Sequence, residues 1–246
     1  MENALTIALS RVISQQRGVE VRAHNIANAA TPGYRAERML FSDYLVRQVR
    51  TADPAGGRVL QYVQDRATWR DNAAGALTQT GNPLDLAIAG EGFFAVATPA
   101  GERYTRAGRF TLDGDGRIVD AEGNALQGAG GALLVPPDAG RVAVSAEGAV
   151  STDQGETGRL RIVRFDDEAR LRREGSRLFR AETPPQDMAR PKVVQGAVEE
   201  SNVRSVVELT LLMEDMREFQ MATSFIEKEA ERLASIPDRI LRGRRS

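Results

Sequence analysis

Both ends of the chain carry an apolar side chain every seven residues, and a second seam position is also mostly apolar, with Gln16 as a polar interruption near the N-terminus. Near the N-terminus the large members are Leu5, Leu9, Val12, Val19 and Ile26. Near the C-terminus they are Leu209, Leu212, Met216, Phe219, Ile226 and Leu233. This spacing is typical of helices that pack lengthwise against other helices, so it predicts one helix at each end of the chain.

Proline and glycine set the limits of both predicted helices. The first runs to about residue 28 and is stopped by Thr31-Pro32-Gly33, since proline lacks the backbone N–H. The second has no glycine or proline between Val198 and Ile236, and Pro237 ends it. Its acidic residues lie mostly off the seam, where we expect them to face solvent or a partner. They are Glu208, Glu214, Asp215, Glu218, Glu227 and Glu229.

Between the two helices, from about residue 69 to 194, the pattern changes to short β-prone runs separated by turn residues. The runs cover residues 92–96, 109–112, 117–119, 141–144 and 159–165, and a hairpin turn is expected at residues 113–116. Such spacing indicates an antiparallel sandwich or barrel-like domain. We expect Trp69, Phe93 and Phe94 to lie in its core.

The predicted fold class is therefore α+β. Two terminal helices pair into a coiled-coil-like stalk, and an all-β antiparallel domain is inserted between them. The expected divisions are an N-terminal helix and turn motif over 1–35, an extended connector over 36–68, the β-rich domain over 69–195, and the C-terminal helix over 196–246.

A stalk of two helices cannot bury both flanks of its apolar seam, so we expect it to be marginally stable by itself. One hypothesis is that the ends are labile in the free chain and become ordered when copies or relatives pack beside them. The alternative is an ordinary pair of helices that packs onto the β domain of the same chain. The pattern alone does not separate the two.

Composition narrows the function classes. The 246 residues include 33 Lys plus Arg and 34 Asp plus Glu, which lacks the basic excess that nucleic-acid binding needs. No apolar run is long enough to span a membrane, and the first 30 residues lack the features of a cleaved secretion signal. There is no cysteine and one histidine, His24, so disulfides, thiolate nucleophiles and His-pair zinc sites are excluded.

The remaining candidates for chemistry each have a simpler structural interpretation. His24 lies in an Asn-rich helical block, where packing or hydrogen bonding is the expected role. Asp113-Gly114-Asp115-Gly116 lacks the glycine and glutamate spacing of a calcium loop and is expected to be a turn. Acidic pairs such as Asp166-Asp167 could serve a glycosidase, whose carboxylates only need to meet in space, but nothing marks this pair and a solvated turn is the expected role. We therefore predict a protein with no catalytic, metal or cofactor site.

The most distinctive stretch runs from His24 to Arg35 (HNIANAATPGYR). Asn25 and Asn28 are three residues apart and share a helix face, from which their amides could bond the backbone of a neighbouring helix. The block resembles the signature of flagellar basal-body rod and hook proteins. His24 and Ala30 depart from the usual family pattern. Residues 80–94, 104–110 and 195–203 resemble further blocks of that family, in the same order along the chain.

This resemblance implies a subunit of the bacterial flagellar rod, a helical tube that transmits torque, with terminal helices inside and β domains outside. It also implies export through the flagellar type III apparatus without a cleaved signal, and a final place in the periplasmic space. Length and the compact middle are most similar to the proximal-rod member, with the distal-rod member or another rod or hook protein as the alternative. The implied partners are other rod proteins, copies of itself and the export apparatus, with no nucleic acid and no membrane insertion.

The residues expected to make assembly contacts are the two seams together with the signature block. They are Leu5, Leu9, Val12, Val19, Asn25, Ile26, Asn28, Thr31, Gly33, Tyr34, Leu209, Leu212, Met216, Phe219, Ile226 and Leu233. A different class, a secreted β-rich binding module on a helical stalk, would bind a ligand through its loops. A carboxylate-based hydrolase is a third possibility, and no residue of the chain marks one.

Overall fold

The computed structural model describes residues 2–48, 58–136 and 138–243, with side chains for residues 8–40, 68–136, 138–232 and 234. The chain divides into two compact units. One, called the helical unit here, consists of Met1–Ile26, Glu37–Trp69 and Arg204–Ser246. The other, called the β unit, consists of Ala27–Ala36 and Arg70–Val203. The backbone therefore passes between the units four times.

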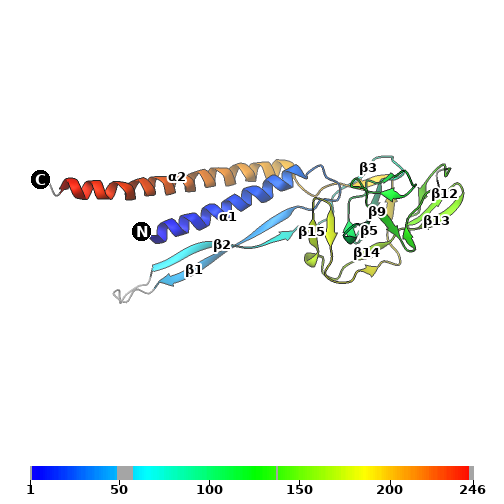
Figure 1. Cartoon of the computed structure of the whole chain (residues 1–246), viewed down its shortest axis with the longest axis horizontal. Coiled ribbons are helices and arrows are strands. Elements are labelled where there is room, and N and C mark those ends of the chain that lie inside the picture. The colour runs from blue at the N-terminus through cyan, green and yellow to red at the C-terminus, as the bar shows by residue number, and fades with distance from the viewer. Residues whose placement is uncertain (1, 49–57, 137, 244–246) are drawn as a thin grey trace. The chain divides into compact units, whose positions relative to one another are not determined.

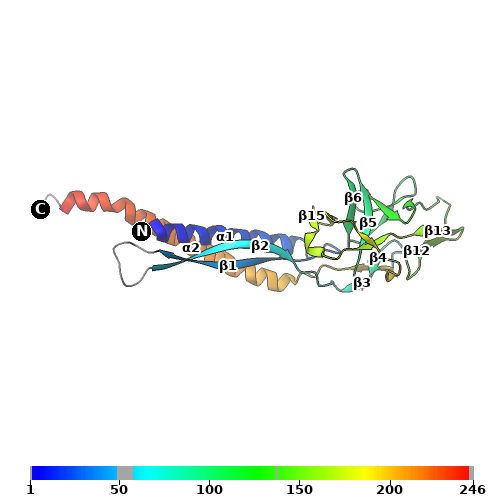
Figure 2. The same cartoon turned by 90° about the horizontal axis from the view of Figure 1, so that it is seen from below.

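The helical unit contains two long helices and two paired strands. Its elements are α1 (Glu2–Ala27), β1 (Glu37–Gln48), β2 (Arg58–Arg70) and α2 (Ser205–Gly243). Within this unit α1 runs alongside α2, and β1 and β2 form a two-stranded sheet that follows the helices (Figure 1). In the view from below, β1 and β2 run along the helices and pass in front of them (Figure 2). The segment expected as an extended connector, residues 36–68, thus supplies most of a pair of strands.

Both terminal helices are present, but the second has different limits from those predicted. Residues 197–199 form a strand, and α2 begins at Ser205, because backbone groups of residues 197–199 pair with those of Leu77–Gln79. The prediction that Pro237 ends the helix is wrong, since the helical backbone continues to Gly243. A proline removes one helix hydrogen bond and favours a kink, but a helix can continue beyond it.

The β unit is built from short antiparallel strands. They are β3 (Leu77–Gln79), β4 (Leu86–Ile88), β5 (Phe93–Thr98), β6 (Gly101–Thr105), β7 (Thr111–Leu112), β8 (Ile118–Val119), β9 (Ala125–Gly128), β10 (Gly131–Ala132), β11 (Ala143–Val144), β12 (Ala149–Thr152), β13 (Gly155–Arg159), β14 (Ile162–Arg164), β15 (Arg172–Glu174), β16 (Leu178–Arg180), β17 (Gln186–Asp187), β18 (Val193–Gln195) and β19 (Ala197–Glu199). A 3₁₀ turn, η1, spans Glu168–Arg170. The prediction of an antiparallel β-rich middle is confirmed.

Strand β5 is the centre of the largest sheet, where it pairs with β6, β9 and β14. Side chains alternate between the two faces of a strand, so neighbouring residues of β5 enter different cores. Phe94 packs edge-on against Phe110 in one apolar cluster, with ring centroids 5.4 Å apart. Phe93 packs edge-on against Phe165 and Phe179 in the other, at 5.8 and 5.7 Å.

Two predictions about aromatic residues have different outcomes. Phe93 and Phe94 are buried in the core of the β unit, as expected. The prediction for Trp69 is wrong, because this side chain lies on β2 in the helical unit and is 49% exposed. A large apolar side chain at the end of a strand run indicates β structure, but the alternation does not say which face is covered.

The predicted turn at residues 113–116 joins β7 to β8. The carboxylate of Asp113 accepts hydrogen bonds from the backbone N–H groups of Asp115 and Arg117, at 2.9 and 2.8 Å. The backbone N–H of Gly116 donates to the carbonyl of Asp113 at 3.1 Å. These bonds lower the pKa of Asp113, with the N–H of Arg117 as the largest cause. The acidic loop therefore folds as a turn.

Candidate assembly interface

Helices α1 and α2 meet through polar and charged groups. The guanidinium of Arg22 binds the carboxylate of Asp215. Nearer the N-terminus of α1, the amide of Gln15 donates to Glu218 at 2.7 Å. Gly18 lies between them, and a Cβ there would be 3.3 Å from the Asp215 carboxylate. Residues later in α1 contact residues earlier in α2, so the two helices run antiparallel.

Glu208 joins both helices to strand β1. Its side chain is fully buried, and its carboxylate accepts hydrogen bonds from Arg38 and from the amide of Asn25, the latter at 3.4 Å. Asn25 in turn donates to the carbonyl of Glu37 and accepts from its N–H, both at 2.9 Å. Backbone groups of strand β1 and a side chain of α2, both in the same chain, therefore occupy the hydrogen-bonding groups of Asn25.

The expectation that the acidic residues of α2 face solvent or a partner is wrong for two of them. Glu208 is buried, and Asp215 binds Arg22 across the helix pair. A carboxylate becomes buried at little net cost only when cations and N–H donors surround it, and here Arg38, Arg22 and Asn25 do so. The sequence contained one sign of this buried polar contact. Asparagine is unusual inside a helix, and no local interaction explains Asn25.

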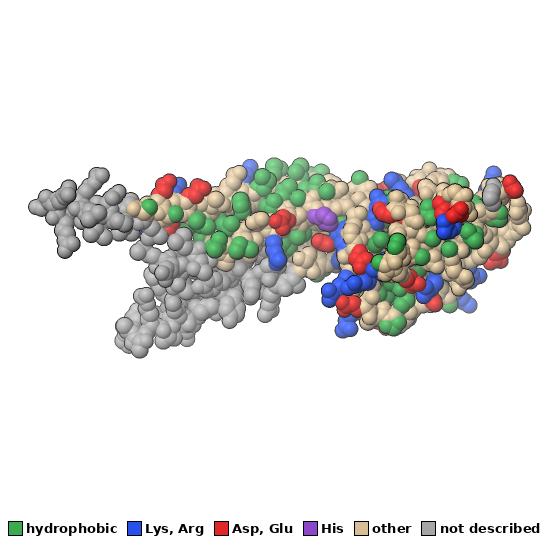
Figure 3. All heavy atoms as spheres, viewed as in Figure 1, with side chains coloured by type: hydrophobic (Ala, Val, Ile, Leu, Met, Phe, Trp, Pro, Cys, Tyr) green, Lys and Arg blue, Asp and Glu red, His purple; other side chains and the backbone are tan. Residues whose placement is uncertain are grey.

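The apolar seams, by contrast, are only partly covered. Leu9, Leu209 and Met216 are 53%, 50% and 46% exposed. The other seam residues with described side chains are partly buried: Val12, Val19, Ile26, Leu212, Phe219 and Ile226. The side chains of Leu5 and Leu233 lie outside the described part of the chain. Hydrophobic side chains gather along the two helices in the space-filling view (Figure 3).

The seams border a groove between α1 and α2. It has a volume of about 440 Å³ and is lined by Gln16, Val19, Glu20, Met216, Phe219 and Gln220. Val19, Met216 and Phe219 of this lining are predicted seam positions. The groove is an apolar surface that the described part of the chain leaves open to solvent.

A second exposed apolar set lies on another side of α2. Met221 and Phe225 are mostly exposed and are four residues apart, so they lie one above the other on one helix face. Met216 and Phe225 are nine residues apart, which at 3.6 residues per turn places them on opposite sides of the helix. Helix α2 therefore presents apolar side chains in more than one direction.

The signature block continues into the β unit, where its last residues are buried. Gly33 has a φ of 68°, and its N–H donates to the carbonyl of Glu199 at 2.7 Å. A Cβ at this position would lie 2.4 Å from the carbonyl carbon of Arg106. Tyr34 is buried beneath the guanidinium of Arg173, which lies 4.2 Å from the ring centroid.

Asn28 and Thr31 form the turn that follows α1. The backbone N–H of Thr31 donates to the carbonyl of Asn28 at 3.0 Å, and its hydroxyl donates to the Asn28 side chain at 3.2 Å. Asn28 is buried and Thr31 is partly buried. Asn28 and Thr31 of the signature block therefore make contacts within this chain. The predicted assembly residues that are exposed lie on the helices.

Arg106 and Glu199 form a buried ion pair at the base of the signature block. Their closest atoms are 3.2 Å apart, and both side chains are 2% exposed. Arg106 also donates to the carbonyl of Gly90 at 2.7 Å. Burial lowers the pKa of the Arg106 guanidinium, and the carboxylate of Glu199 opposes that shift. The sequence pattern did not single out either residue, although both lie in blocks that carry the family resemblance.

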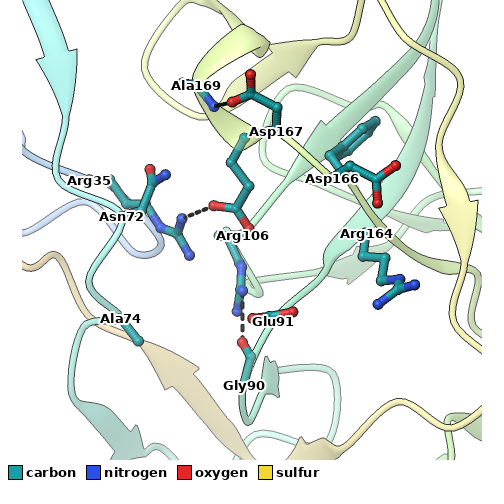
Figure 4. Close-up of a pocket in the computed structure, with 12 residues that line it drawn as sticks. Arg35, Asn72, Ala74, Gly90, Glu91, Arg106, Arg164, Asp166, Asp167 and Ala169 are labelled. Atoms are coloured by element: carbon teal, nitrogen blue, oxygen red, sulfur yellow. Dashed lines mark hydrogen bonds and ion pairs between the residues drawn. The ribbon is translucent and has the colours of Figure 1, made fainter.

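Arg106 also lines a cleft of about 620 Å³ in the β unit (Figure 4). Its wall includes Arg35, whose guanidinium binds Glu168 at 2.7 Å. Asp167, one of the acidic pair considered for glycosidase chemistry, accepts from the N–H of Ala169 at 3.0 Å and caps η1. Glu168 and Asp167 thus have structural roles here.

Metal binding and membrane crossing have no candidate residues in the described part of the chain. No group of three or more His, Asp or Glu side chains within those residues could hold a metal ion. Neither described helix combines the length and the apolar run that crossing a lipid bilayer takes. His24 lies in the last turn of α1 and is exposed.

Comparison with known families matches three parts of the chain. Residues 5–35 match the family described as flagella basal body rod protein. Residues 87–152 match the flagellar hook protein FlgE/F/G D1 domain, and residues 194–236 match the flagellar basal body rod FlgEFG protein C-terminal family. The order along the chain is that of the blocks in the sequence.

Whole-chain relatives agree with these matches. The chain is 36% identical over 243 residues to the flagellar basal-body rod protein FlgF of Caulobacter vibrioides, covering 98% of both chains. It is 33% identical to FlgF of Mesorhizobium japonicum, covering 94% of both. It is also 33% identical to the flagellar basal-body rod protein FlgG of Agrobacterium fabrum, covering 97% of this chain and 99% of that protein.

Proposed function

Because this chain belongs to the flagellar basal-body rod protein family and is a structural subunit of that rod, we propose that it occupies the proximal part of the rod. Two relatives named FlgF, the member that the family resemblance associates with the proximal rod, support this assignment, at 36% and 33% identity. The distal-rod protein is the alternative, since FlgG relatives reach 33%.

The mode of assembly in this proposal is lateral packing of α1 and α2 against helices of neighbouring subunits, in a coiled-coil-like manner. The observation that carries it is the open apolar groove between the helices, with Met216 and Phe219 in its wall. Full burial of a Met, Leu or Phe side chain contributes about 1.5–3 kcal/mol. Leu9, Leu209 and Met216 are about half exposed, so a neighbouring helix that covers them would gain about half of that contribution from each.

An open helical assembly requires two different surfaces on each subunit, one that meets the other on the next copy. Helix α2 supports this requirement, because Met216 faces the groove and Phe225 faces the opposite side. Repeated contacts of this kind would build the hollow, torque-transmitting shaft that the family resemblance implies. The partners in the proposal are copies of this chain and the other proximal and distal rod proteins.

The proposal includes a difference between free and assembled chains. The apolar clusters found among the described residues all lie in the β unit, and the contacts between α1 and α2 that we describe are polar. We expect the helices of the free chain to be cleaved readily by protease and to become resistant in the rod. Equal protease resistance of residues 1–30 and of the β unit in free chains would contradict this part.

The remaining elements of the proposal concern location and chemistry. We propose that the chain passes through the flagellar export apparatus, without a cleaved signal, into the periplasmic part of the basal body. We propose also that it catalyses no reaction and binds no cofactor, because the conspicuous charged groups of the signature region are engaged in bonds within the fold. Loss of the chain should therefore remove a rod component and not a metabolic activity.

The experiment that tests the assembly surface is Met216→Asp in a strain that lacks the chromosomal copy. Met216 is half exposed, so the charge costs the free chain little but disfavours burial against a neighbour. We expect the variant to be missing from purified basal bodies and the cells to be non-motile. Thr111→Asp, at an exposed position of β7, is the matched control and should assemble normally.

Normal incorporation of Met216→Asp would show that the groove is not an assembly surface. The order of assembly separates the two rod positions. If the chain is a proximal subunit, it should still be incorporated into basal bodies of a strain that lacks the distal-rod protein. If the chain is itself the distal-rod protein, its absence should leave a rod that ends before the distal part.

A further inference from the structure

The segments by which the backbone enters and leaves the β unit are connected to one another by two residues close to α2. The entry and exit points lie next to Ala27, Ala36, Arg70 and Val203. Glu199 and Asn202, three residues apart, bond backbone groups that follow α1 and backbone groups that follow β2. We refer to these two residues and their bonds as the clamp.

Asn202 uses both its donor and its acceptor groups in the clamp. Its side-chain oxygen accepts from the N–H of Ala36 at 2.7 Å. Its side-chain nitrogen donates to the carbonyls of Asp71 and Ala73, both at 2.9 Å. Its own N–H donates to the carbonyl of Tyr34 at 3.3 Å. One amide side chain thus joins segments that are 166 and 131 residues away along the chain.

Glu199 makes a parallel set of contacts. Its carbonyl accepts from the N–H of Gly33, and its carboxylate accepts from the N–H of Gly75 at 3.2 Å. The other carboxylate oxygen binds Arg106, which anchors the set to β-unit residues beyond the entry and exit segments. Gly75 is needed here, because a Cβ would lie 1.8 Å from the carbonyl oxygen of Glu200. The direct bond from the N–H of Asp71 to the carbonyl of Ala36 completes the set at 2.9 Å.

The residue types at these positions suit bonds to the backbone of several segments at once. Asparagine can accept and donate at one position, whereas an aspartate there would retain the bond to Ala36 and lose both donors to Asp71 and Ala73. Ala36 is fully buried, so its N–H has no water to replace a lost partner. The bonded atoms in the entry and exit segments are backbone atoms, so the clamp holds the path of the chain and not a particular side chain.

We propose that Glu199 and Asn202 are positioning residues that share mechanical load among the entry and exit segments of the β unit. The inference rests on the proposed function, because only a subunit of a torque-transmitting rod experiences such load. The covalent chain passes between the helical unit and the β unit at these points, so force carried by the backbone enters the β unit through these segments. Segments bonded to one another are displaced together under that force, whereas unbonded segments can be displaced separately.

Amide hydrogen exchange on the purified full chain tests the clamp itself. Asn202→Asp removes the two donors and retains the acceptor, and Asn202→Ala removes all three side-chain bonds. We expect exchange at Ala36 to accelerate about tenfold in Asn202→Ala and less in Asn202→Asp. Asn124→Ala, which removes a buried amide bonded to Asp120 in the turn between β8 and β9 and not to Ala36, is the matched control and should leave Ala36 unchanged. Unchanged exchange at Ala36 in Asn202→Ala would overturn the proposal.

Torque measurements on tethered cells test the load-sharing role. We expect cells with Asn202→Asp to build basal bodies in wild-type numbers and to rotate normally at low load, with a loss of torque near stall. Asn124→Ala should match the wild type at every load. Wild-type stall torque in both Asn202 variants would overturn the role, even if exchange at Ala36 is faster. Failure of both variants to enter basal bodies, with normal entry of Asn124→Ala, would also overturn it in favour of a role in assembly.

Failure of the proposed function has a different signature. If the wild-type chain is missing from purified basal bodies, the rod assignment is wrong. The exchange experiment would still report whether Asn202 holds Ala36, because it does not depend on assembly.

Discussion

The two units of this chain differ in how far their apolar side chains are covered, although both contain buried charged groups. In the β unit, Phe93 and Phe94 lie in two apolar clusters, and most charged side chains are at the surface. In the helical unit, the fully buried Glu208 and the ion pair of Arg22 with Asp215 lie between elements, while Leu209 and Met216 face outward. One unit buries its apolar residues itself, and the other keeps apolar side chains available.

This difference indicates how stability and specificity are divided. Apolar burial supplies free energy without direction, whereas charged and amide groups require a particular register. The polar contacts of α1 with α2 and β1 set their register without using the seams. The free energy of burying the seams is therefore left for contacts with other subunits, as the proposed mode of assembly requires.

The largest expected effect comes from breaking the buried ion pair of the β unit. Arg106→Met leaves Glu199 as an unpaired buried carboxylate, which should reduce the free energy of unfolding by about 3–5 kcal/mol. Denaturant unfolding followed by near-ultraviolet circular dichroism of the buried aromatic residues measures it. Adding Glu199→Gln should restore part of the loss. A loss well below about 1 kcal/mol would show that the β unit does not depend on this pair.

The next largest effect concerns the docking of the signature block. Gly33→Ala combines a positive φ with a clash against the backbone of Arg106, and should cost about 3 kcal/mol. Gly81→Ala has a similar φ of 75° but open space around the Cβ, so it should cost only about 1 kcal/mol. The same unfolding measurement compares them. Equal losses would mean that the close approach of residues 33 and 106 contributes nothing.

A smaller effect tests the polar contacts of the helical unit. Arg22→Met removes the bonds to Asp215 and Glu208 and should weaken the pairing of α1 with α2 by about 1 kcal/mol. Amide exchange of α1 measures this pairing, and about 1 M salt should accelerate exchange more in the wild type than in the variant. Arg217→Met, at an exposed position of α2, is the control. Equal salt sensitivity of wild type and Arg22→Met would contradict an ionic register.

The smallest effect concerns acid sensitivity of the turn between β7 and β8. The pKa of Asp113 is lowered in the folded state, so its contribution is present above the ordinary pKa of an aspartate and is lost as the pH falls through the lowered value. Asp113→Asn should therefore show a smaller fall in Tm between pH 7 and strongly acidic pH than the wild type. Glu147→Gln, at an exposed position, controls for the loss of one charge. A larger acid-induced fall in the variant would contradict this sign.

Local pattern predicted several elements well, because the relevant signals lie within a few residues of each other. The sevenfold repeat from Leu5 to Ile26 corresponds to α1, and the run around Phe93 corresponds to β5. The turn at Asp113 follows from short-range bonds to Arg117 and Gly116. The signature block also indicated the family, since its residues are contiguous along the chain.

The local sequence pattern did not predict contacts between residues far apart in the chain. The pairing of β1 with β2 was not predicted, because residues 36–68 carry no alternation that stands out from a connector. The burial of Glu208 depends on Arg38, 170 residues away, and no local rule relates the two. For the same reason the heptads identified the apolar face of each helix but not whether the other helix or a neighbouring subunit would cover it.

The sequence by itself determined that a helix lies near each end, that the middle is β-prone, which positions are apolar and to which family the chain belongs. Those properties depend on backbone preferences and on side-chain spacing, which are local. Only the tertiary structure decided that residues near 33, 106 and 199 meet, and that charged groups occupy the space between the helices. These long-range contacts depend on all buried donors, acceptors and apolar surfaces together. Each buried polar group requires a partner, and its neighbours along the chain do not provide one.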